Sequence, residues 1–580
     1  MAQALVLDGH SRAAIEATQS LGRAGVTVTV SSSDPTPITF RSRYAHRRLP
    51  QPPALPEEPF LAWMRELDAR ARYDLIIPST ENALQAFLAL DADDSLRRRA
   101  VLSSNQSLAH ALDRRLTWKL AAELGVPVPA TRLIESLPSS PTSATSFPTV
   151  LKPARSKILD RGVLRTFAPV IARDAECYTS VLRDWIPRMA VLEQEYVQGW
   201  GVGIELLYRE GRFAWYFAHE RLHEWPLTGG ASTYRRAIEP PAKMLEAARA
   251  LLDRLEWHGV AMVEFKRRTD GSFALMEINP RLWGSLALSI DAGVNFPLGL
   301  LRLATGGNLD PQPHYRRGMR TRHISADVVW QKANLFADRQ DPLLLVRPRL
   351  RSMLEPLLLL SGQERWDHFS WLDPAPGLHE CRRVIQTVHD AVRRSLLIRS
   401  LRRRRKSLVQ RAVRRITAAQ GSRPPVILFL CEGNICRSPF AELVARQKLP
   451  GYHILSAGFD QRAQRSTPLN VSSEAARLNY DMSDCRSTPV TESLLRSADL
   501  VCIMDLGQHT KLAERFPGIP LKSVPLGLFC SPPIVEIQDP DRRDAPTTRR
   551  ILGQILSAVE GLTDALNATI PDARPVRSGS

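Results

Sequence analysis

The chain opens with apolar and polar positions in the order strand, turn, helix, strand. The run ALVLDGH is followed by a helical pattern, RAAIEATQSLGRAG, and by a β-branched run, VTVTVSS. Two such runs joined by one helix are typical of a parallel βαβ unit. A further apolar run, DLIIPST, precedes a helical pattern that begins near Glu81. We therefore predict a small α/β domain over residues 1–105.

Changes of pattern divide the rest of the chain into four segments. An amphipathic helical pattern from Asp113 ends at Gly125, and strands and helices then continue to about Gly306. The pattern is irregular after that, becomes helical from Leu378 to about Ala419, and is broken by GSRPP before an α/β alternation resumes. Gly, Ser and Pro together are typical of a domain boundary. The predicted segments are 106–306, 307–377, 378–423 and 424–570.

Length and composition fit a soluble multidomain protein. A chain of 580 residues is too long for one hydrophobic core, and 44% hydrophobic with 24% charged residues is ordinary for globular domains. The N-terminus has no basic head, and no uninterrupted apolar stretch approaches ~18 residues. Seven cysteines, an odd number, fit reduced thiols better than a disulfide framework. We expect a cytoplasmic protein.

Positive charge is concentrated in one helical segment. Residues 391–416 hold eleven Lys or Arg and no acid, which leaves +7 of the net charge of +18 for the rest of the chain. Apolar residues recur near helical spacing between the arginines, and such a helix can bind an anionic membrane peripherally or a polyanion. No aromatic residue lies there to stack on bases. A solvated linker helix packed on one domain explains the same pattern more simply, and both interpretations stay open.

The segment VILFLCEGNICRSP, residues 426–439, joins a buried strand pattern to a short loop and a helix start. Five residues separate Cys431 from Arg437 in this loop. Loop amides and a helix N-terminus can point at one anion, and Arg437 can hold two of its oxygens. The same positive field favours the thiolate of Cys431, the nucleophilic form. A buried structural Cys beside a surface Arg has the same spacing by chance, so the neighbouring segments decide.

CEGNICRSP resembles the signature loop of the low-molecular-weight protein-tyrosine phosphatases. SAGF at 456–459, ADLVCIMDLGQH at 498–509 and EIQDP at 536–540 resemble further segments of that family. The resemblance implies a flavodoxin-like parallel-sheet domain that hydrolyses phosphomonoesters through a phosphocysteine, without a cofactor. It also implies catalytic roles for five residues: Cys431 as nucleophile, Arg437 on the phosphoryl oxygens, Ser438 assisting the thiolate, Asn434 fixing the loop and Asp539 as general acid.

Two positions depart from the family pattern. Glu432 stands where an apolar residue commonly lines the ring slot, and Asp541 stands where an aromatic residue is common. Both add negative charge and weaken the case for phosphotyrosine, whereas Ile435 is the residue type of tyrosine-directed members. A phosphotyrosine protein and a small phosphomonoester both stay open as substrates, and arsenate ranks below them because the thiols are widely spaced. Cys436 could form a protective disulfide with Cys431 or simply pack the loop.

Four strings in the first half of the chain resemble the ATP-grasp superfamily in their order and spacing: FPTVLKPA, VLEQEYVQG, AMVEFKRR and MEINPRLWGS. The resemblance covers roughly residues 1–305 and is greatest for carbamoyl-phosphate-synthase-like and carboxylate–amine ligase members. It implies an α/β multidomain architecture, in which a preATP-grasp α/β domain precedes an ATP-grasp α+β domain. Such a module binds ATP and Mg²⁺ and forms an acyl phosphate that an amine attacks. The sequence does not identify the carboxylate or the amine.

The same resemblance implies nucleotide and metal roles for eight residues. Carboxylates and an amide on two adjacent strands suit Mg²⁺. Glu277 lies within an apolar run, FALMEINP, where an unpaired acid is costly, and this favours a metal partner over a solvated strand position. The implied residues are Lys152, Arg114 and Arg281 for the phosphates, the main chain of Glu195 and Val197 for adenine, and Glu264, Glu277 and Asn279 for the metal.

The loop after Lys152 departs from the superfamily. It reads ARSKILDRG and holds only Gly162, where several glycines commonly close over the phosphates. Arg155 and Lys157 could supply charge in place of amides. The alternative to a bifunctional enzyme is therefore an ATP-grasp half that binds nucleotide and regulates the phosphatase without ligase activity.

Overall fold

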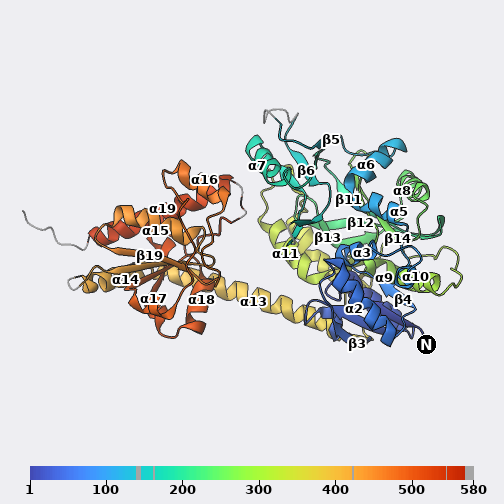
Figure 1. The fold of residues 1–580 in the computed structure, drawn as a ribbon, viewed down its shortest axis with the longest axis horizontal. Helices are drawn as coiled ribbons and strands as arrows, with labels where there is room; N and C mark the ends of the chain where they lie inside the picture. Colours follow the sequence, from blue (N-terminus) through green and yellow to red (C-terminus); the bar gives the residue numbers. More distant parts are fainter. Residues whose placement is uncertain (139–145, 161–162, 421–422, 542, 544, 569–580) are drawn as a thin grey trace, which may run out of the picture. The chain divides into compact units, whose positions relative to one another are not determined.

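The computed structural model describes the chain except for residues 139–145, 161–162, 421–422, 542, 544 and 569–580 (Figure 1). The chain forms two compact units, unit 1 (Met1–Thr387) and unit 2 (Val388–Ser580). The finer division into five domains, with 378–423 as a separate helical segment, stays a prediction.

Unit 1 begins with a four-stranded parallel sheet of order β3-β2-β1-β4, which confirms the predicted βαβ opening. The first helix starts where Ser11 accepts a hydrogen bond from the Ala14 amide, so a short polar side chain satisfies one free amide of the first turn. The elements are β1 (Gln3–Val6), α1 (Arg12–Arg23), β2 (Thr27–Ser32), β3 (Ala45–Pro50), α2 (Glu57–Arg70), β4 (Leu75–Ile77), α3 (Glu81–Phe87), α4 (Ser95–Arg99) and α5 (Asn105–Leu112).

Two larger sheets follow, and their strands carry five of the eight predicted nucleotide and metal residues. The first has the order β5-β10-β6-β9, and the second the order β15-β14-β11-β12-β13-β16-β17. Their strands pair antiparallel, except that β16 and β17 are parallel. The elements are α6 (Arg114–Glu123), β5 (Thr131–Ile134), β6 (Thr149–Pro153), β7 (Lys157–Asp160), β8 (Val163–Thr166), β9 (Val170–Ala172), α7 (Ala175–Trp185), β10 (Val191–Glu195), β11 (Trp200–Arg209), β12 (Arg212–Trp225), β13 (Ala231–Ala237), α8 (Ala242–Arg254), β14 (Gly259–Arg267), β15 (Phe273–Asn279), α9 (Leu286–Ala292) and α10 (Phe296–Ala304).

The irregular segment 307–377 completes the second sheet. Strands β16 (Arg320–Arg322) and β17 (Glu364–Trp366) form its edge, and α11 (Ile324–Phe336) packs against β12 and β13. Apolar periodicity could not reveal these strands, because they are three residues long and carry buried charges. Arg322 Nε lies 2.7 Å from Glu364 Oε1, so the charges pair inside the sheet instead of facing solvent. A short helix, α12 (Arg349–Leu354), precedes β17.

Unit 2 is built on a parallel sheet of order β19-β18-β20-β21, as predicted for a flavodoxin-like domain. Its central strand is buried on both faces, which explains why it reads as a continuous apolar run. The elements are α13 (Ala375–Arg403, which crosses the unit boundary), α14 (Arg405–Ala419), β18 (Val426–Cys431), α15 (Arg437–Lys448), β19 (His453–Gly458), α16 (Leu469–Arg477), α17 (Glu492–Ser497), β20 (Leu500–Ile503), α18 (Leu506–Arg515), β21 (Ser523–Pro525) and α19 (Ala545–Asn567).

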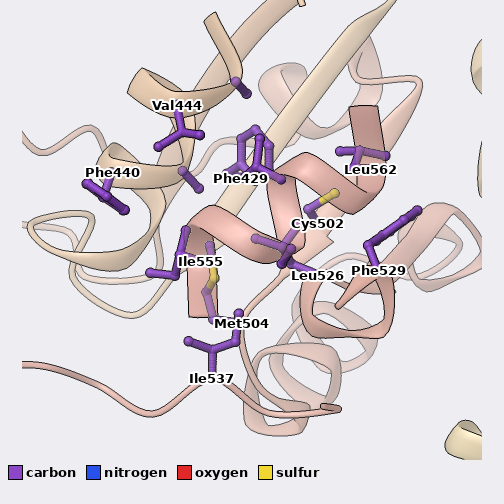
Figure 2. Close-up of a cluster of buried hydrophobic side chains, with 14 of the residues drawn as sticks. Phe429, Phe440, Val444, Cys502, Met504, Leu526, Phe529, Ile537, Ile555 and Leu562 are labelled. Carbon is purple, nitrogen blue, oxygen red and sulfur yellow. The ribbon is translucent and has the colours of Figure 1, made fainter. Parts of the chain in front are cut away.

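Helices α15 and α19 cover one face of this sheet. Figure 2 shows the core between them, where Phe429 of β18 lies among Val444 of α15 and Ile555 and Leu562 of α19. Leu428, next along β18, belongs to the core on the opposite face. The alternation of neighbouring side chains between two cores fixes the register of β18, because a slip of one residue would exchange the two sets.

The basic segment 391–416 takes part in unit 2 through α14. Its apolar residues join the core, and Arg405 donates to the carbonyls of Leu528 over 2.7 Å and Cys530 over 2.9 Å. This is the packing expected of a linker helix docked on one domain, while a contact with an anionic membrane or polyanion stays a prediction. The buried residues of α14 are Ala412, Val413 and Ile416.

Within the described part of the chain, no single helix has the length and apolar character needed to cross a membrane. The bent pair α9 and α10 meets that test only when its two helices are taken together. Both helices contribute buried residues to the core of unit 1, among them Leu286 and Phe296.

Replacement of Ile416 by Ala should destabilise unit 2 by about 2–4 kcal/mol, because it empties a fully buried aliphatic position. All eleven tryptophans lie in unit 1, so hydrogen exchange of peptides from β18 and β20 is the suitable probe. Leu396→Ala is the control, since that side chain is 59% exposed. Equal protection in wild type and Ile416→Ala would show that α14 is not part of the folded unit.

Candidate functional site

The loop between β18 and α15 surrounds the thiol of Cys431. Cys431 ends β18 and is buried, and Arg437 is the first residue of α15. The Ser438 hydroxyl donates to Cys431 Sγ over 3.0 Å, and the backbone amide of Asn434 donates to the same sulfur over 3.2 Å. Hydrogen-bond donors at a helix N-terminus favour a thiolate, the nucleophilic form of cysteine.

Asn434 fixes the shape of this loop. Its backbone lies in the left-handed region, with φ of 49°, where Asn is tolerated better than most residues. Its side-chain nitrogen donates to Ser438 Oγ over 2.9 Å and to Ser456 Oγ over 2.8 Å. Its side-chain oxygen accepts from the Thr488 amide over 2.7 Å. One buried side chain therefore ties the loop to α15, to β19 and to the segment that follows α16.

Arg437 lies between two carboxylates at this loop. Its guanidinium donates to Asp539 Oδ2 over 2.6 Å and to Asp505 Oδ2 over 2.9 Å. The structure thus brings all five residues predicted for the phosphatase together. Asp505 was missed as a site residue, although its spacing from Gln508 forms a capping box at α18 that a sequence pattern can reveal.

In unit 1, strands of both antiparallel sheets line a cavity of about 510 Å³, which we call the nucleotide cavity. Four predicted residues lie on its walls: Lys152, Glu195, Val197 and Glu264. Burial lowers the pKa of Lys152 to about 8, and the nearby Arg114 guanidinium adds to the fall. A volume in this range suits a cofactor-sized ligand.

The main chain at the end of β10 limits how adenine could bind. The Glu195 amide donates to the Ala130 carbonyl over 2.9 Å, so the predicted contact of Glu195 with adenine would have to use its carbonyl oxygen. Lys266, which sequence reasoning did not single out, donates to the Val197 carbonyl over 3.3 Å and also lines the cavity.

The three predicted metal ligands lie together. Glu264 and Glu277 face each other in the register of β14 and β15, and Asn279 Nδ2 donates to Glu264 Oε1 over 3.1 Å and to Glu277 Oε1 over 3.0 Å. Burial raises the pKa of the Glu264 carboxyl despite its ion pair with Arg221 at 2.5 Å. Burial opposes the charge of Glu277, but Arg114, 3.3 Å away, holds its pKa below the ordinary value. Two adjacent carboxylates and an amide oxygen are a fitting donor set for Mg²⁺.

We call Glu264, Glu277 and Asn279 the metal set. A smaller hollow of about 30 Å³ adjoins it, and the residues that line this hollow include Arg114, Glu277, Asn279 and Arg281. The eight predicted residues therefore surround two neighbouring spaces with the metal set between them. Sequence reasoning missed Arg221, because a half-buried arginine inside a long strand such as β12 has no local signal.

The loop after Lys152 forms the β7–β8 hairpin. Arg155 pairs with Asp113 at 3.5 Å, and Lys157 Nζ donates to Asn82 Oδ1 over 2.8 Å. Both cations therefore already have protein partners. Gly162 lies outside the described residues.

A cluster of His323, His368 and Glu380 is close enough to hold a metal ion. Its groups are engaged with one another and with α11, however. Glu380 Oε1 accepts from Ser325 Oγ over 2.7 Å, and His323 Nδ1 accepts from the Ala326 amide over 3.3 Å. We interpret the cluster as a network that caps α11.

Comparison with known proteins assigns the phosphatase domain to a family. The family model "Low molecular weight phosphotyrosine protein phosphatase" matches residues 426–571. A probable low-molecular-weight protein-tyrosine-phosphatase, EpsP of Ralstonia nicotianae, is 31% identical over 142 residues, which cover 24% of this chain and 96% of EpsP. Through residues 426–571, the chain belongs to the low-molecular-weight protein-tyrosine-phosphatase family. The crystal structure of the Erwinia amylovora tyrosine phosphatase amsI is 26% identical, with a TM-score of 0.24, over 25% of this chain and 96% of that one.

Unit 1 matches a second family model. The model "ATP-grasp in the biosynthetic pathway with Ter operon" covers residues 189–326, which include the metal set. The crystal structure of N5-carboxyaminoimidazole synthetase from Staphylococcus aureus is 16% identical, with a TM-score of 0.42, over 54% of this chain and 80% of that one. By the two family models, an ATP-grasp match at residues 189–326 precedes the phosphatase domain in the chain.

The two unusual residues of the phosphatase domain lie at the edge of its loop. Glu432 pairs with Lys511 at 2.5 Å, so its charge is matched by a cation that sequence reasoning did not single out. The Asp541 amide donates to Asp539 Oδ1 over 3.1 Å, so Asp541 helps to hold the predicted acid through its backbone. Ile435 packs against the core of unit 2.

The other cysteines of the phosphatase domain are poor candidates for a thiol relay. Burial raises the pKa of the Cys436, Cys485, Cys502 and Cys530 thiols, and the neighbouring Asp539 adds to the rise at Cys436. A protonated thiol is a weak nucleophile. The choice between a protective disulfide and a packing role for Cys436 stays open.

Gly458→Ala should weaken the binding of inorganic phosphate by the phosphatase domain about tenfold or more. A Cβ at this position would lie 2.8 Å from the Asn434 amide nitrogen and 2.9 Å from the Glu432 carbonyl oxygen, and a displaced amide loses part of a charge-assisted hydrogen bond. Titration calorimetry measures the change. Gly451→Ala is the matched control, because its Cβ would meet no atom within 4 Å. Equal affinity in both variants would contradict the role of the loop shape.

Proposed function

We propose that the chain is a bifunctional enzyme. The phosphatase domain would hydrolyse a phosphomonoester through a phosphocysteine, and the ATP-grasp module would activate a carboxylate as an acyl phosphate for attack by an amine. The observation that carries the first activity is the pair of hydrogen bonds that Ser438 and Asn434 donate to Cys431 Sγ, at 3.0 and 3.2 Å.

In the first phosphatase step, the Cys431 thiolate attacks phosphorus and the bond to the ester oxygen breaks. The phosphoryl oxygens replace Asp539 as partners of Arg437. Asp539, released from this ion pair and carrying a proton taken up from solvent, gives that proton to the leaving oxygen. In the second step, Asp539 takes a proton from water, the new P–O bond forms and the S–P bond breaks. Phosphate leaves, and the thiolate is restored.

The surroundings of the loop favour a substrate that can bind next to charged side chains. Glu432 and Lys511 form a half-exposed ion pair there, in place of a purely apolar ring slot. We propose a phosphotyrosine protein as the substrate, as the names of the relatives suggest, with a small phosphomonoester as the alternative. Hydrolysis rates of a tyrosine-phosphorylated peptide and of a sugar phosphate, compared at equal concentration, separate the two.

In the ATP-grasp module, the protein groups would position the nucleotide and the acid. Lys152 and Arg114 would bind phosphate oxygens, and Arg281 would steady the γ-phosphate during its transfer to the carboxylate. Bound to Glu264, Glu277 and Asn279, Mg²⁺ would supply charge neutralisation at the phosphates. A bound phosphate would favour the charged form of Lys152, whose pKa burial lowers to about 8.

A non-catalytic, regulatory ATP-grasp module is the second candidate. The β7–β8 hairpin favours it, because Arg155 and Lys157 there already have protein partners. ADP release in the presence of candidate carboxylates and amines separates a ligase from a regulator. ATP binding without ADP release under every pairing would favour the regulator.

Asp539→Asn should slow a phenyl ester more than a p-nitrophenyl ester, by a factor within the ~10²–10⁴ that general acid assistance contributes. Phenolate is the more basic leaving group and needs the proton more. Cys431→Ser should abolish both reactions, because the nucleophile is required whatever leaves. The measurement is the rate of phosphoenzyme formation with each ester. Equal slowing of the two esters by Asp539→Asn would make Asp539 a turn residue and direct the search to Asp541 and to Asp544, which lies outside the described residues.

Glu277→Ala should remove most of the Mg²⁺-dependent part of ATP affinity, about tenfold or more, because it deletes one of two paired carboxylates. Titration calorimetry with ATP, with and without Mg²⁺, gives this difference. Glu246→Ala, at an exposed position of α8, is the control. Unchanged Mg²⁺ dependence in Glu277→Ala would refute the metal assignment.

A further inference from the structure

A second cavity of about 500 Å³ lies in unit 1, and none of the predicted site residues lines it; we call it the arginine cavity. One wall is formed by β12, β13 and β16, and the other by the segment 344–358. The Leu345 amide donates to the Leu227 carbonyl over 2.7 Å, which fixes this segment over the sheet. The proposed function assigns no ligand to the arginine cavity.

The arginine cavity and the nucleotide cavity share part of their walls. Arg221 and Glu224 line both. Arg221 also pairs with Glu264 of the metal set at 2.5 Å. A ligand in the arginine cavity would therefore approach the end of the nucleotide cavity at which the metal set lies.

The acidic residues of the arginine cavity already have partners. Arg236 Nε donates to Glu220 Oε1 over 2.7 Å, and two backbone amides donate to Glu224 over 2.8 and 3.1 Å. Glu355 Oε2 lies 2.9 Å from His223 Nε2. Glu220 is thus paired with an arginine, and the five arginines of the lining outnumber its three acids.

Three arginines of the cavity, Arg320, Arg347 and Arg351, pair with no carboxylate among the residues that the structure describes. Arg320 donates to the Gln363 side-chain oxygen over 3.4 Å, and Arg347 to the Leu222 carbonyl over 3.4 Å, both long hydrogen bonds. Arg320 and Arg347 are half-buried, and Arg351 is exposed. A guanidinium without a counter-ion attracts a carboxylate, which it can hold through two oxygens.

The rest of the lining is apolar. Trp200 and Leu222 come from the sheet side, and aliphatic residues of the covering segment complete the surface. An aliphatic ligand body would displace water from these side chains, and each buried CH₂ group contributes about fourfold in affinity. The aliphatic residues of the covering segment are Leu344, Leu345, Val346 and Leu358.

We propose that the arginine cavity binds the carboxylate substrate of the ATP-grasp module, and that this substrate has an apolar body. The arginines hold the carboxylate, and Leu345 and its neighbours contact the body. The role as substrate rests on the proposed ligase function, but the binding itself does not require ATP. Octanoate is a suitable probe, with acetate and octanol as the matched compounds that lack the body and the charge.

Titration calorimetry on the full chain should give octanoate an affinity about tenfold or more above that of acetate and of octanol. Arg347→Ala should weaken octanoate about fivefold or more, and Arg320→Ala, on the sheet side, should do the same. Arg349→Ala is the matched control, because Arg349 is exposed on α12 and does not line the cavity.

Octanoate that binds no better than acetate, or that is weakened equally by Arg347→Ala and Arg349→Ala, would overturn the proposal. Binding of Mg²⁺-ATP by each variant serves as the test of folding. Absence of Mg²⁺-ATP binding in the wild type, with octanoate binding intact, would instead remove the ligase function and leave the anion site standing. The two failures are therefore distinguishable.

Discussion

The buried side-chain amide of Asn434 determines the shape of the loop between β18 and α15. The chemistry of the phosphatase domain depends on this loop. Asn434 connects α15, β19 and the segment after α16 through three side-chain hydrogen bonds of 2.7–2.9 Å. Its own backbone amide then points at Cys431 Sγ. The loop backbone passes close to β19, where Gly458 has no side chain and leaves room for the Asn434 backbone. Removing any of these contacts would leave a buried polar group without its hydrogen-bond partner, and this would destabilise the folded domain.

In unit 1, ion pairs balance the carboxylates of the metal set. Arg221 and Arg114 each pair with one carboxylate of the metal set. A cation bound between Glu264 and Glu277 would weaken the ion pairs that these carboxylates make with Arg221 and Arg114. Both arginines could then bind phosphate oxygens, which would couple metal binding to phosphate binding. Burial lowers the pKa of Lys152 to about 8, and the positive charge of Arg114 adds to the fall.

The sequence was most informative where a motif and its local structure coincide. Cys431, Ser438 and Arg437 lie within one strand–loop–helix, so their proximity follows from the chain itself. The parallel sheet of unit 2 was predictable because β18 is apolar throughout. Glu264 and Glu277 were predictable as neighbours because a hairpin joins their strands.

What escaped prediction depends on contacts between distant segments. Arg221 lies in the interior of a long strand and meets Glu264 only through sheet pairing. Strands β16 and β17 carry buried ion pairs in place of an apolar pattern. The arginine cavity likewise exists only because the segment 344–358 folds back over β12 and β13. Local periodicity holds no information about such pairings.

The most direct test of the account is to trap the covalent intermediate. The Asp539→Asn protein, mixed rapidly with p-nitrophenyl phosphate and quenched, should accumulate a phosphoryl group because the base for its hydrolysis is missing. Mass spectrometry of the peptide that contains the loop should then place that group on Cys431. A phosphoryl group on another residue, or p-nitrophenol release with no phosphoenzyme at any time point, would contradict the account.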